Sequence, residues 1–209
     1  TSLVSLENTC NRGGGSCYGI EEIQKIRAVC NEHGLKLHLD GARIFNALVA
    51  KKQSALEYGQ LFHTISVCLS KGLGCPVGSV LIGPADFIKK ARRIRKVLGG
   101  GMRQAGYIAA AGIYALHNHI DRLEEDHQHA QQLGATLESC SFVSRVLPVE
   151  TNIVIFDVAE NYTAPSLVAQ LKENGIWAFA ISNSQVRLVT HLDVSSDMVA
   201  ETIRIFKQL

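Results

Sequence analysis

A lysine in a glycine-rich turn, and an acid followed closely by an arginine, are the residues of this chain best suited to chemistry. Lys71 lies in the run Ser70–Gly74, and Asp40 and Arg43 stand upstream of it. A lysine amine can form a Schiff base with an aldehyde, and a carboxylate can hold a pyridine nitrogen protonated. Together these residues predict an enzyme that uses pyridoxal 5'-phosphate (PLP).

Each of these residues also has a simpler interpretation. A single lysine after a strand is most often a solvated side chain. The nearby glycines leave space for a flat ring, and Leu69 is expected to desolvate the amine of Lys71. Asp40 fits the N-cap of the helix that follows it. Arg43 fits a bidentate carboxylate contact, or a surface pair with Asp40.

Two further arginines are candidates for binding anions. Arg187 lies within the β-type run 186–191, where an arginine is costly to bury unless it meets an anion such as a substrate carboxylate. The alternative is an arginine on an edge strand that faces water. Arg103 follows three glycines and would either bind phosphate or simply begin the next helix.

Composition limits the class of protein. The chain has 209 residues, 46% of them hydrophobic and 19% charged, with a net charge of +2. These values fit a globular protein and favour neither nucleic acid nor a membrane as partner. The six cysteines and the histidines show no metal-binding spacing, so we expect reduced cysteines, no metal and a cytoplasmic location. The basic run 89–96 is interpreted as a solvated helix face.

Strands and helices alternate along the first half of the chain. Strands are expected at 1–6, 35–39, 64–69 and 78–82, the last one antiparallel, and helices at 20–33, 43–51 and 84–97. We interpret the first strand as buried. Asp40 and Lys71 follow the second and third strands, so an open α/β sheet would carry the site along its carboxyl edge.

The second half has a different pattern. A long helical stretch covers 102–133, and strands at 142–147, 152–158, 177–180 and 185–189 alternate with helices at 164–174 and 196–208. This order is typical of a smaller α+β domain. The chain begins with Thr1 inside a predicted strand, so we expect a fragment of a longer subunit.

Six motifs, taken in order, resemble the low-specificity L-threonine aldolases. They are SLENTCN (5–11), HLDGARIFNA (38–47), CLSKGLGCPVGSV (68–80), LGGGMRQAG (98–106), NIV (152–154) and RLVTHLDV (187–194). The resemblance covers essentially the whole chain. It implies a PLP-dependent enzyme of the aspartate-aminotransferase-like fold type I. The implied domains are the C-terminal part of a PLP-binding large domain (1–103), a connecting helical segment (104–136) and a small α+β domain (137–209).

The resemblance also implies roles for individual residues. Lys71 would bond to the cofactor aldehyde, and Asp40 would pair with the pyridine nitrogen. Arg43 and Arg187 would hold the carboxylate of the amino acid. Two further basic residues, Arg103 and Lys96, would reach the site of a neighbouring subunit near the cofactor phosphate, within a homo-oligomer (a dimer or tetramer).

The implied reaction is cleavage of L-threonine or L-allo-threonine to glycine and acetaldehyde. Two departures from the family pattern bear on it. Cys10 occupies a position near the substrate side chain where the family usually has histidine. The family's upstream phosphate-binding turn and the histidine that stacks on the cofactor do not occur in these residues, so we expect weak or absent activity from them alone.

The base that takes the hydroxyl proton is not identified by the sequence, and His191 is one candidate. Two rival functions stay open. One is a related β-eliminating lyase, and the other is a catalytically silent fragment that serves as an oligomerisation module.

Overall fold

The computed structural model describes residues 1–209, which divide into two compact units. Unit 1 comprises Thr1–Thr9 and Cys17–Asp121, and unit 2 comprises Cys10–Ser16 and Arg122–Leu209. The helical stretch expected at 102–133 is two helices, α5 (Gly106–Asn118) in unit 1 and α6 (Leu123–Leu137) in unit 2. The three-part domain assignment stays a prediction.

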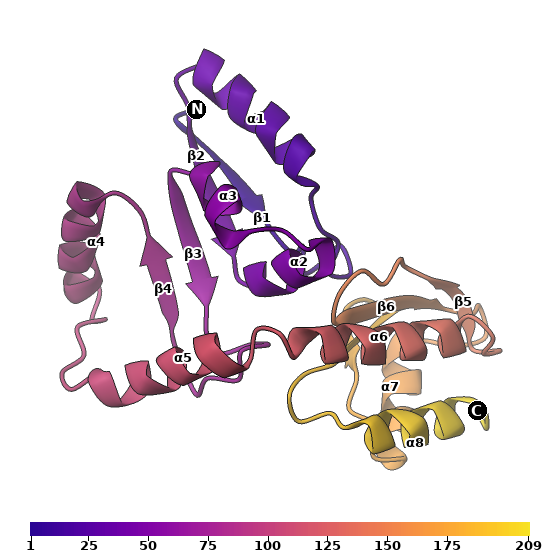
Figure 1. The fold of residues 1–209 in the computed structure, drawn as a ribbon. Helices are drawn as coiled ribbons and strands as arrows, with labels where there is room; N and C mark the ends of the chain where they lie inside the picture. The colour runs from indigo at the N-terminus through magenta and orange to yellow at the C-terminus, as the bar shows by residue number, and fades with distance from the viewer. The chain divides into compact units, whose positions relative to one another are not determined.

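Unit 1 is built on a four-stranded sheet (Figure 1). Its strands, in spatial order, are β1 (Leu3–Glu7), β2 (Lys36–Gly41), β3 (Thr64–Cys68) and β4 (Ser79–Ile82). The pairs β1–β2 and β2–β3 are parallel, and β3–β4 is antiparallel. The prediction that the strand at 78–82 is antiparallel is therefore confirmed.

Three helices pack against one face of this sheet. They are α1 (Ile20–Glu32), α2 (Ile44–Lys51) and α3 (Ala55–Gln60), the last of which the sequence analysis did not identify. Their apolar side chains form one core cluster with the inward positions of β2 and β3. Helix α1 ends just before Gly34, which adopts a left-handed φ of 63° that a glycine tolerates without strain. The helix expected at 20–33 is confirmed.

The expectation that the first strand is buried is wrong. Leu3 is 49% exposed, and no residue of β1 is fully buried. The reason is position, because β1 lies at one edge of the sheet and only Val4 and Leu6 pack partly against the core. An alternating apolar pattern predicts which side chains face inward, but it does not predict what covers the strand.

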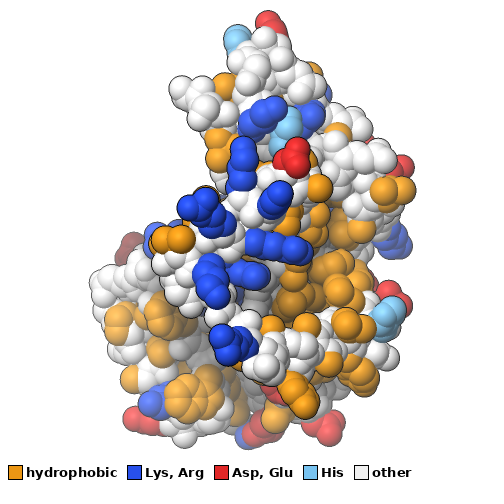
Figure 2. Space-filling view, turned by 90° about the vertical axis from the view of Figure 1, so that its left-hand side faces the viewer, with side chains coloured by type: hydrophobic (Ala, Val, Ile, Leu, Met, Phe, Trp, Pro, Cys, Tyr) orange, Lys and Arg blue, Asp and Glu red, His pale blue; other side chains and the backbone are white.

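Helix α4 (Ala85–Val97) carries no buried residue. Figure 2 shows lysine and arginine side chains gathered on the face where α4 lies, beside hydrophobic ones. The exposed hydrophobic side chains of α4 and the chain that follows it include Ile94, Val97, Leu98 and Met102. This helix therefore presents both a basic and an apolar surface.

Unit 2 is an antiparallel sheet covered by helices. The strands lie in the order β5 (Val143–Val146), β6 (Ile153–Val158), β8 (Gln185–Val189) and β7 (Phe179–Ala180). Helices α6, α7 (Ala164–Glu173) and α8 (Ser196–Phe206) contribute to its core. Phe142 lies at the centre, in edge contact with the rings of Phe156, Tyr162 and Phe206.

The loop Cys10–Ser16 is part of unit 2, although the strand before it belongs to unit 1. The buried Thr151 hydroxyl donates a hydrogen bond of 2.8 Å to the carbonyl oxygen of Gly15. Gly14 and Gly15 both adopt left-handed φ angles, 71° and 79°. The loop is thus held in place by contacts across unit 2.

Two further observations concern the chain as a whole. All six cysteines are free thiols, in agreement with the sequence analysis. None of the helices combines the length and the apolar character needed to cross a membrane.

Replacing Gly15 by alanine tests how this loop is held. A Cβ on Gly15 would collide with Thr151 Oγ1, whereas the nearest atom to a Cβ on Gly14 is 3.8 Å away. Both substitutions cost about 1 kcal/mol for the left-handed backbone, and Gly15→Ala should cost roughly 1–3 kcal/mol more from overpacking. Urea unfolding, followed by the fluorescence of the single tryptophan, Trp177 in unit 2, measures the difference. Equal losses for Gly14→Ala and Gly15→Ala would contradict the assignment.

Candidate active site

The carboxyl ends of two parallel strands bring Asp40 and Lys71 to the same edge of the unit 1 sheet. Asp40 is the penultimate residue of β2, and β3 ends at Cys68, three residues before Lys71. In the parallel register, Asp40 lies opposite Ser66. The turns that carry the acid and the amine therefore leave the sheet side by side.

The acid and the amine also lie on the same face of the sheet. Leu39 and Val67 point into the core, so their neighbours Asp40 and Cys68 point to the opposite, open face. Lys71 Nζ donates to Cys68 Sγ at 3.3 Å, which keeps the amine on that open face. An amine and a carboxylate on one side of a sheet edge are what a planar heterocyclic aldehyde requires.

Asp40 does not cap helix α2, because the N-cap position belongs to Arg43. The Asp40 side chain is exposed, and its Oδ1 accepts a hydrogen bond of 3.1 Å from the backbone N–H of Ala42. Its own carbonyl oxygen accepts from the N–H of Asn8 at 3.0 Å. The acid is thus fixed by the backbone on both sides, with its carboxylate directed to solvent.

A buried tyrosine supports this backbone from the opposite side. Asn8 Nδ2 donates to the hydroxyl of Tyr58 in α3, and both residues are almost completely buried. Burial is the main cause that raises the pKa of Tyr58 to about 12. The phenol therefore stays protonated at neutral pH and anchors the end of β1 next to Asp40.

The turn that carries Lys71 is a tight one. The N–H of Gly74 donates to the carbonyl oxygen of Lys71 at 2.8 Å, and Gly74 adopts a left-handed φ of 70°. The expectation that Leu69 desolvates the amine is wrong, because Lys71 is exposed. Leu69 instead packs against a small cluster that includes Leu73 and Ala115.

Arg43 lies beside this turn. It is half-buried at the start of α2. A small pocket is lined both by Arg43 and Ala42 and by Cys68, Gly72 and Leu73. The structure therefore groups Asp40, Arg43 and Lys71 at one edge of unit 1.

Lys96 and Arg103 lie outside this group. Both side chains are exposed, Lys96 in the last turn of α4 and Arg103 in the loop before α5. The loop folds back on α4, with the N–H of Gly100 donating to the carbonyl oxygen of Arg95 at 2.8 Å.

Arg187 lies in an interior strand of unit 2. The edge-strand alternative is wrong, since β8 pairs with both β6 and β7. Arg187 Nη1 donates to Asn11 Oδ1 at 2.9 Å, and its guanidinium carbon lies 5.6 Å from the centre of the Phe179 ring. Its Nε is buried without a hydrogen-bond partner. A half-buried guanidinium with an unused donor suits an anion.

Cys10 lies in the same loop as Asn11 and is half-buried. Its N–H donates to the carbonyl oxygen of Ser16 at 3.0 Å, and its carbonyl oxygen accepts from Gly15. No sequence pattern indicated Asn11 as the partner of Arg187. Its position, a polar residue at the end of the quoted SLENTCN motif, was the available signal.

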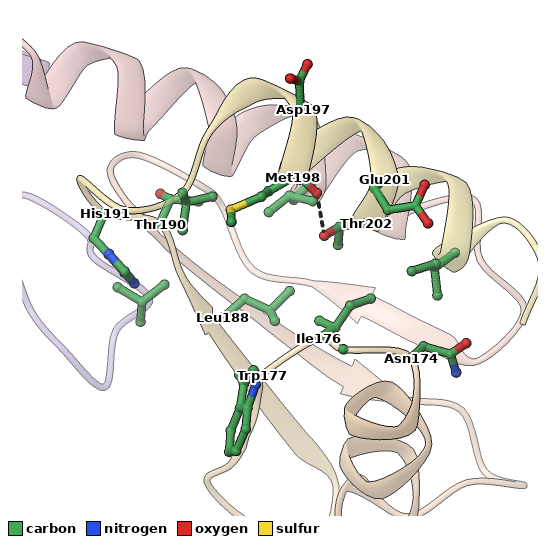
Figure 3. A pocket seen from close by; sticks show the side chains of 15 residues that line it. Asn174, Ile176, Trp177, Leu188, Thr190, His191, Asp197, Met198, Glu201 and Thr202 are labelled. Carbon is green, nitrogen blue, oxygen red and sulfur yellow. Dashed lines mark hydrogen bonds between the residues drawn. The ribbon is translucent and has the colours of Figure 1, made fainter.

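Unit 2 also contains a cavity of about 550 Å³ between β8, α8 and the loop 174–177. Figure 3 shows Leu188 and Ile176 at its floor, with Met198, Trp177 and His191 around it. Neither lysine nor arginine lines it. His191 is exposed there, and its Nδ1 accepts from the N–H of Asp193 at 3.3 Å. Without a cation the cavity does not suit an anionic cofactor.

Comparisons with known proteins identify the sequences that this chain resembles. The chain is 40% identical over 211 residues to the low-specificity L-threonine aldolase 1 of Arabidopsis thaliana, covering 100% of this chain and 59% of that protein. It is 45% identical over 201 residues to the low specificity L-threonine aldolase of Escherichia coli K12, covering 96% of this chain and 58% of that protein. The chain thus spans about three fifths of these relatives, and the predicted resemblance is confirmed.

The fold is confirmed by solved structures. A threonine aldolase from Leishmania major superposes with a TM-score of 0.81 at 24% identity, covering 99% of this chain and 60% of that one. At this identity the likeness concerns the fold alone. The sequence model of the beta-eliminating lyases matches residues 1–161. Because that match covers most of the chain, the protein belongs to the beta-eliminating lyase family.

Proposed function

We propose that these residues form part of a PLP-dependent aldehyde-lyase that cleaves L-threonine or L-allo-threonine to glycine and acetaldehyde. The observation that carries the proposal is the common edge and face of Asp40 and Lys71. The similarity to low-specificity L-threonine aldolases, at 40–45% identity, supports the substrate class.

The residues present fit the cofactor. Lys71 offers an exposed amine in a tight turn, and Asp40 offers an exposed carboxylate on the same face. Lys71 would bind the aldehyde carbon, and Asp40 would hold the pyridine nitrogen in its protonated form. When bound, PLP supplies an electron-withdrawing ring that accepts the electron pair released from the substrate.

Two arginines are proposed to bind and orient the amino acid. Arg43 lies beside the Lys71 turn, and Arg187 keeps a buried Nε without a partner. A guanidinium binds a carboxylate through two parallel hydrogen bonds, which fixes the orientation of the amino acid about its Cα. That orientation decides which bond to Cα is aligned for cleavage.

Two other residues complete the proposal. Cys10 would lie near the substrate side chain, where its thiol is smaller than the family's histidine. Cleavage between Cα and Cβ also requires a base for the β-hydroxyl proton. His191 is exposed and offers an imidazole next to Asp193, so we keep it as a candidate for that base.

A homo-oligomer is part of the proposal. The α4 surface combines exposed apolar residues with Lys96 and Arg103, which would reach the phosphate of the cofactor in a neighbouring subunit. Extended apolar exposure of this kind is typical of interaction surfaces.

The substrate class is tested with the protein expressed from its complete reading frame. Incubation with L-threonine or L-allo-threonine should release acetaldehyde, detected by an NADH-dependent alcohol dehydrogenase. Pyruvate and ammonia formed from L-serine, without acetaldehyde from threonine, would identify the β-eliminating rival. If no product forms and no visible absorption band appears on adding PLP, the result would favour the second rival, a catalytically silent oligomerisation module.

Lys71 is tested by reduction. Borohydride treatment of the PLP-loaded protein should fix a pyridoxyl group on Lys71, located by peptide mass mapping. Lys71→Arg keeps the charge but cannot bond to the aldehyde, so both the label at this position and the turnover should be lost. Lys25→Arg in α1 is the matched control and should keep both. Full turnover in Lys71→Arg would exclude the assignment.

The carboxylate contact is tested by Arg187→Lys. Losing one charge-assisted hydrogen bond costs about 2 kcal/mol, which corresponds to a roughly 30-fold decrease in kcat/KM for threonine. The decrease should appear mainly in KM, because the contact holds the substrate in the ground state as well. Arg145→Lys, on exposed β5, is the control and should leave both constants unchanged. An unchanged KM in Arg187→Lys would remove Arg187 from the proposal.

A further inference from the structure

Lys71 and Cys68 bring two reactive groups into contact. The amine nitrogen and the thiol sulfur lie 3.3 Å apart across the end of β3. Cys68 is half-buried, whereas Lys71 is exposed, so the contact is open to a small solute from the uncovered face of the sheet. The Cys68 thiol can be oxidised, and the Lys71 amine is a nucleophile that can attack the oxidised sulfur.

We propose that a hydroperoxide links Cys68 to Lys71 through a reversible sulfur–nitrogen bond. The structure thereby assigns a modification site to the turn that carries the amine. A sulfenic acid is known to condense with a backbone nitrogen to form a sulfenamide. The amine of Lys71 is a stronger nucleophile than a backbone amide, and it already lies within hydrogen-bonding distance of the sulfur.

The proposed reaction has two steps. The Cys68 thiolate attacks one oxygen of hydrogen peroxide; the O–O bond breaks, hydroxide leaves, and the sulfur is oxidised to sulfenic acid while the peroxide is reduced. The neutral amine of Lys71 then attacks this sulfur. The S–O bond breaks, and the leaving hydroxide takes a proton from nitrogen to form water. The linked protein has lost two hydrogen atoms. Two molecules of an external thiol reduce the sulfur–nitrogen bond, which restores both side chains, and are themselves oxidised to a disulfide.

Two other thiols of the chain, those of Cys75 and Cys140, are paired with backbone carbonyl groups and not with an amine. Cys75 is buried and donates to the carbonyl oxygen of Ala111, and Cys140 donates to the carbonyl oxygen of Thr136. Burial raises the pKa of both thiols, which reduces their thiolate content. They provide internal controls in the same molecule.

The link would regulate the proposed site. This consequence rests on the proposed function, because a nitrogen bonded to sulfur cannot also bond to the aldehyde of PLP. Oxidation would therefore block the cofactor, and an external thiol would restore binding. Cofactor bound beforehand would in turn protect the amine from Cys68.

The experiment treats the full chain, free of cofactor, with hydrogen peroxide and digests it with trypsin without a thiol. Trypsin cuts after Lys52, Lys71 and Lys89, so the untreated chain gives peptides 53–71 and 72–89. A linked Lys71 resists trypsin. We expect loss of peptide 53–71 and the appearance of peptide 53–89, lighter than its calculated mass by two hydrogen atoms. A thiol should restore cleavage.

Three variants complete the test. Cys68→Ser and Lys71→Arg should abolish the light 53–89 species, and Cys75→Ser should keep it. Cleavage at Lys71 after peroxide, with Cys68 either unreacted or carrying only added oxygen, would overturn the proposal. A light species that persists in Cys68→Ser would overturn it as well.

A separate arm distinguishes this proposal from the proposed function. Untreated and peroxide-treated chains are mixed with PLP and reduced with borohydride. If Lys71 carries pyridoxyl in the untreated and thiol-restored chains but not in the peroxide-treated chain, both proposals are supported. A chain that forms the sulfur–nitrogen link but does not take up pyridoxyl at Lys71, even when untreated, would reject the cofactor assignment and keep the modification site.

Discussion

The parallel pairing of β2 with β3 is the constraint on which the rest of the site depends. It sets Asp40 opposite Ser66, and it makes both strands end at the same edge of the sheet. A shift of one residue would turn Asp40 into the core and Leu39 out of it. The apolar cluster on the covered face of the sheet, which includes Leu39 and Val67, stabilises this register. Hydrophobic packing on one face thus decides where the candidate residues lie on the other.

The two faces of the unit 1 sheet have different roles. One is filled by α1, α2 and α3, and the other leaves Asp40 and Lys71 accessible. The anchor between Asn8 and Tyr58 connects the two, because it ties the backbone beside Asp40 to a buried phenol in α3. Cys68 also points to the open face, where it is half-buried and contacts the exposed amine of Lys71.

Unit 2 supplies a different kind of group. Its sheet holds Arg187 in an interior strand, where neighbouring strands and the Phe179 ring restrict the guanidinium. Asn11 accepts a hydrogen bond from Nη1 of Arg187, and Nε of Arg187 has no hydrogen-bond partner. A charged side chain in such a place is costly without an anion, which is the physical argument for the proposed carboxylate-binding role. The hydrogen bond to Asn11 depends on the loop Cys10–Ser16, held through Thr151.

The sequence by itself determined the local elements and the placement of the reactive residues within them. Alternating and helical patterns predicted β2, β3 and α4, because these signals are local. They placed Asp40 after a strand, whereas it is the penultimate residue of β2, and they correctly placed Lys71 beyond the end of β3. Tertiary structure decided what depends on distant partners. Exposure of β1 follows from its edge position, the amine of Lys71 is exposed because Leu69 packs elsewhere, and Arg187 meets Asn11 from far along the chain. No local pattern encodes these contacts, since each arises only when separate segments fold together.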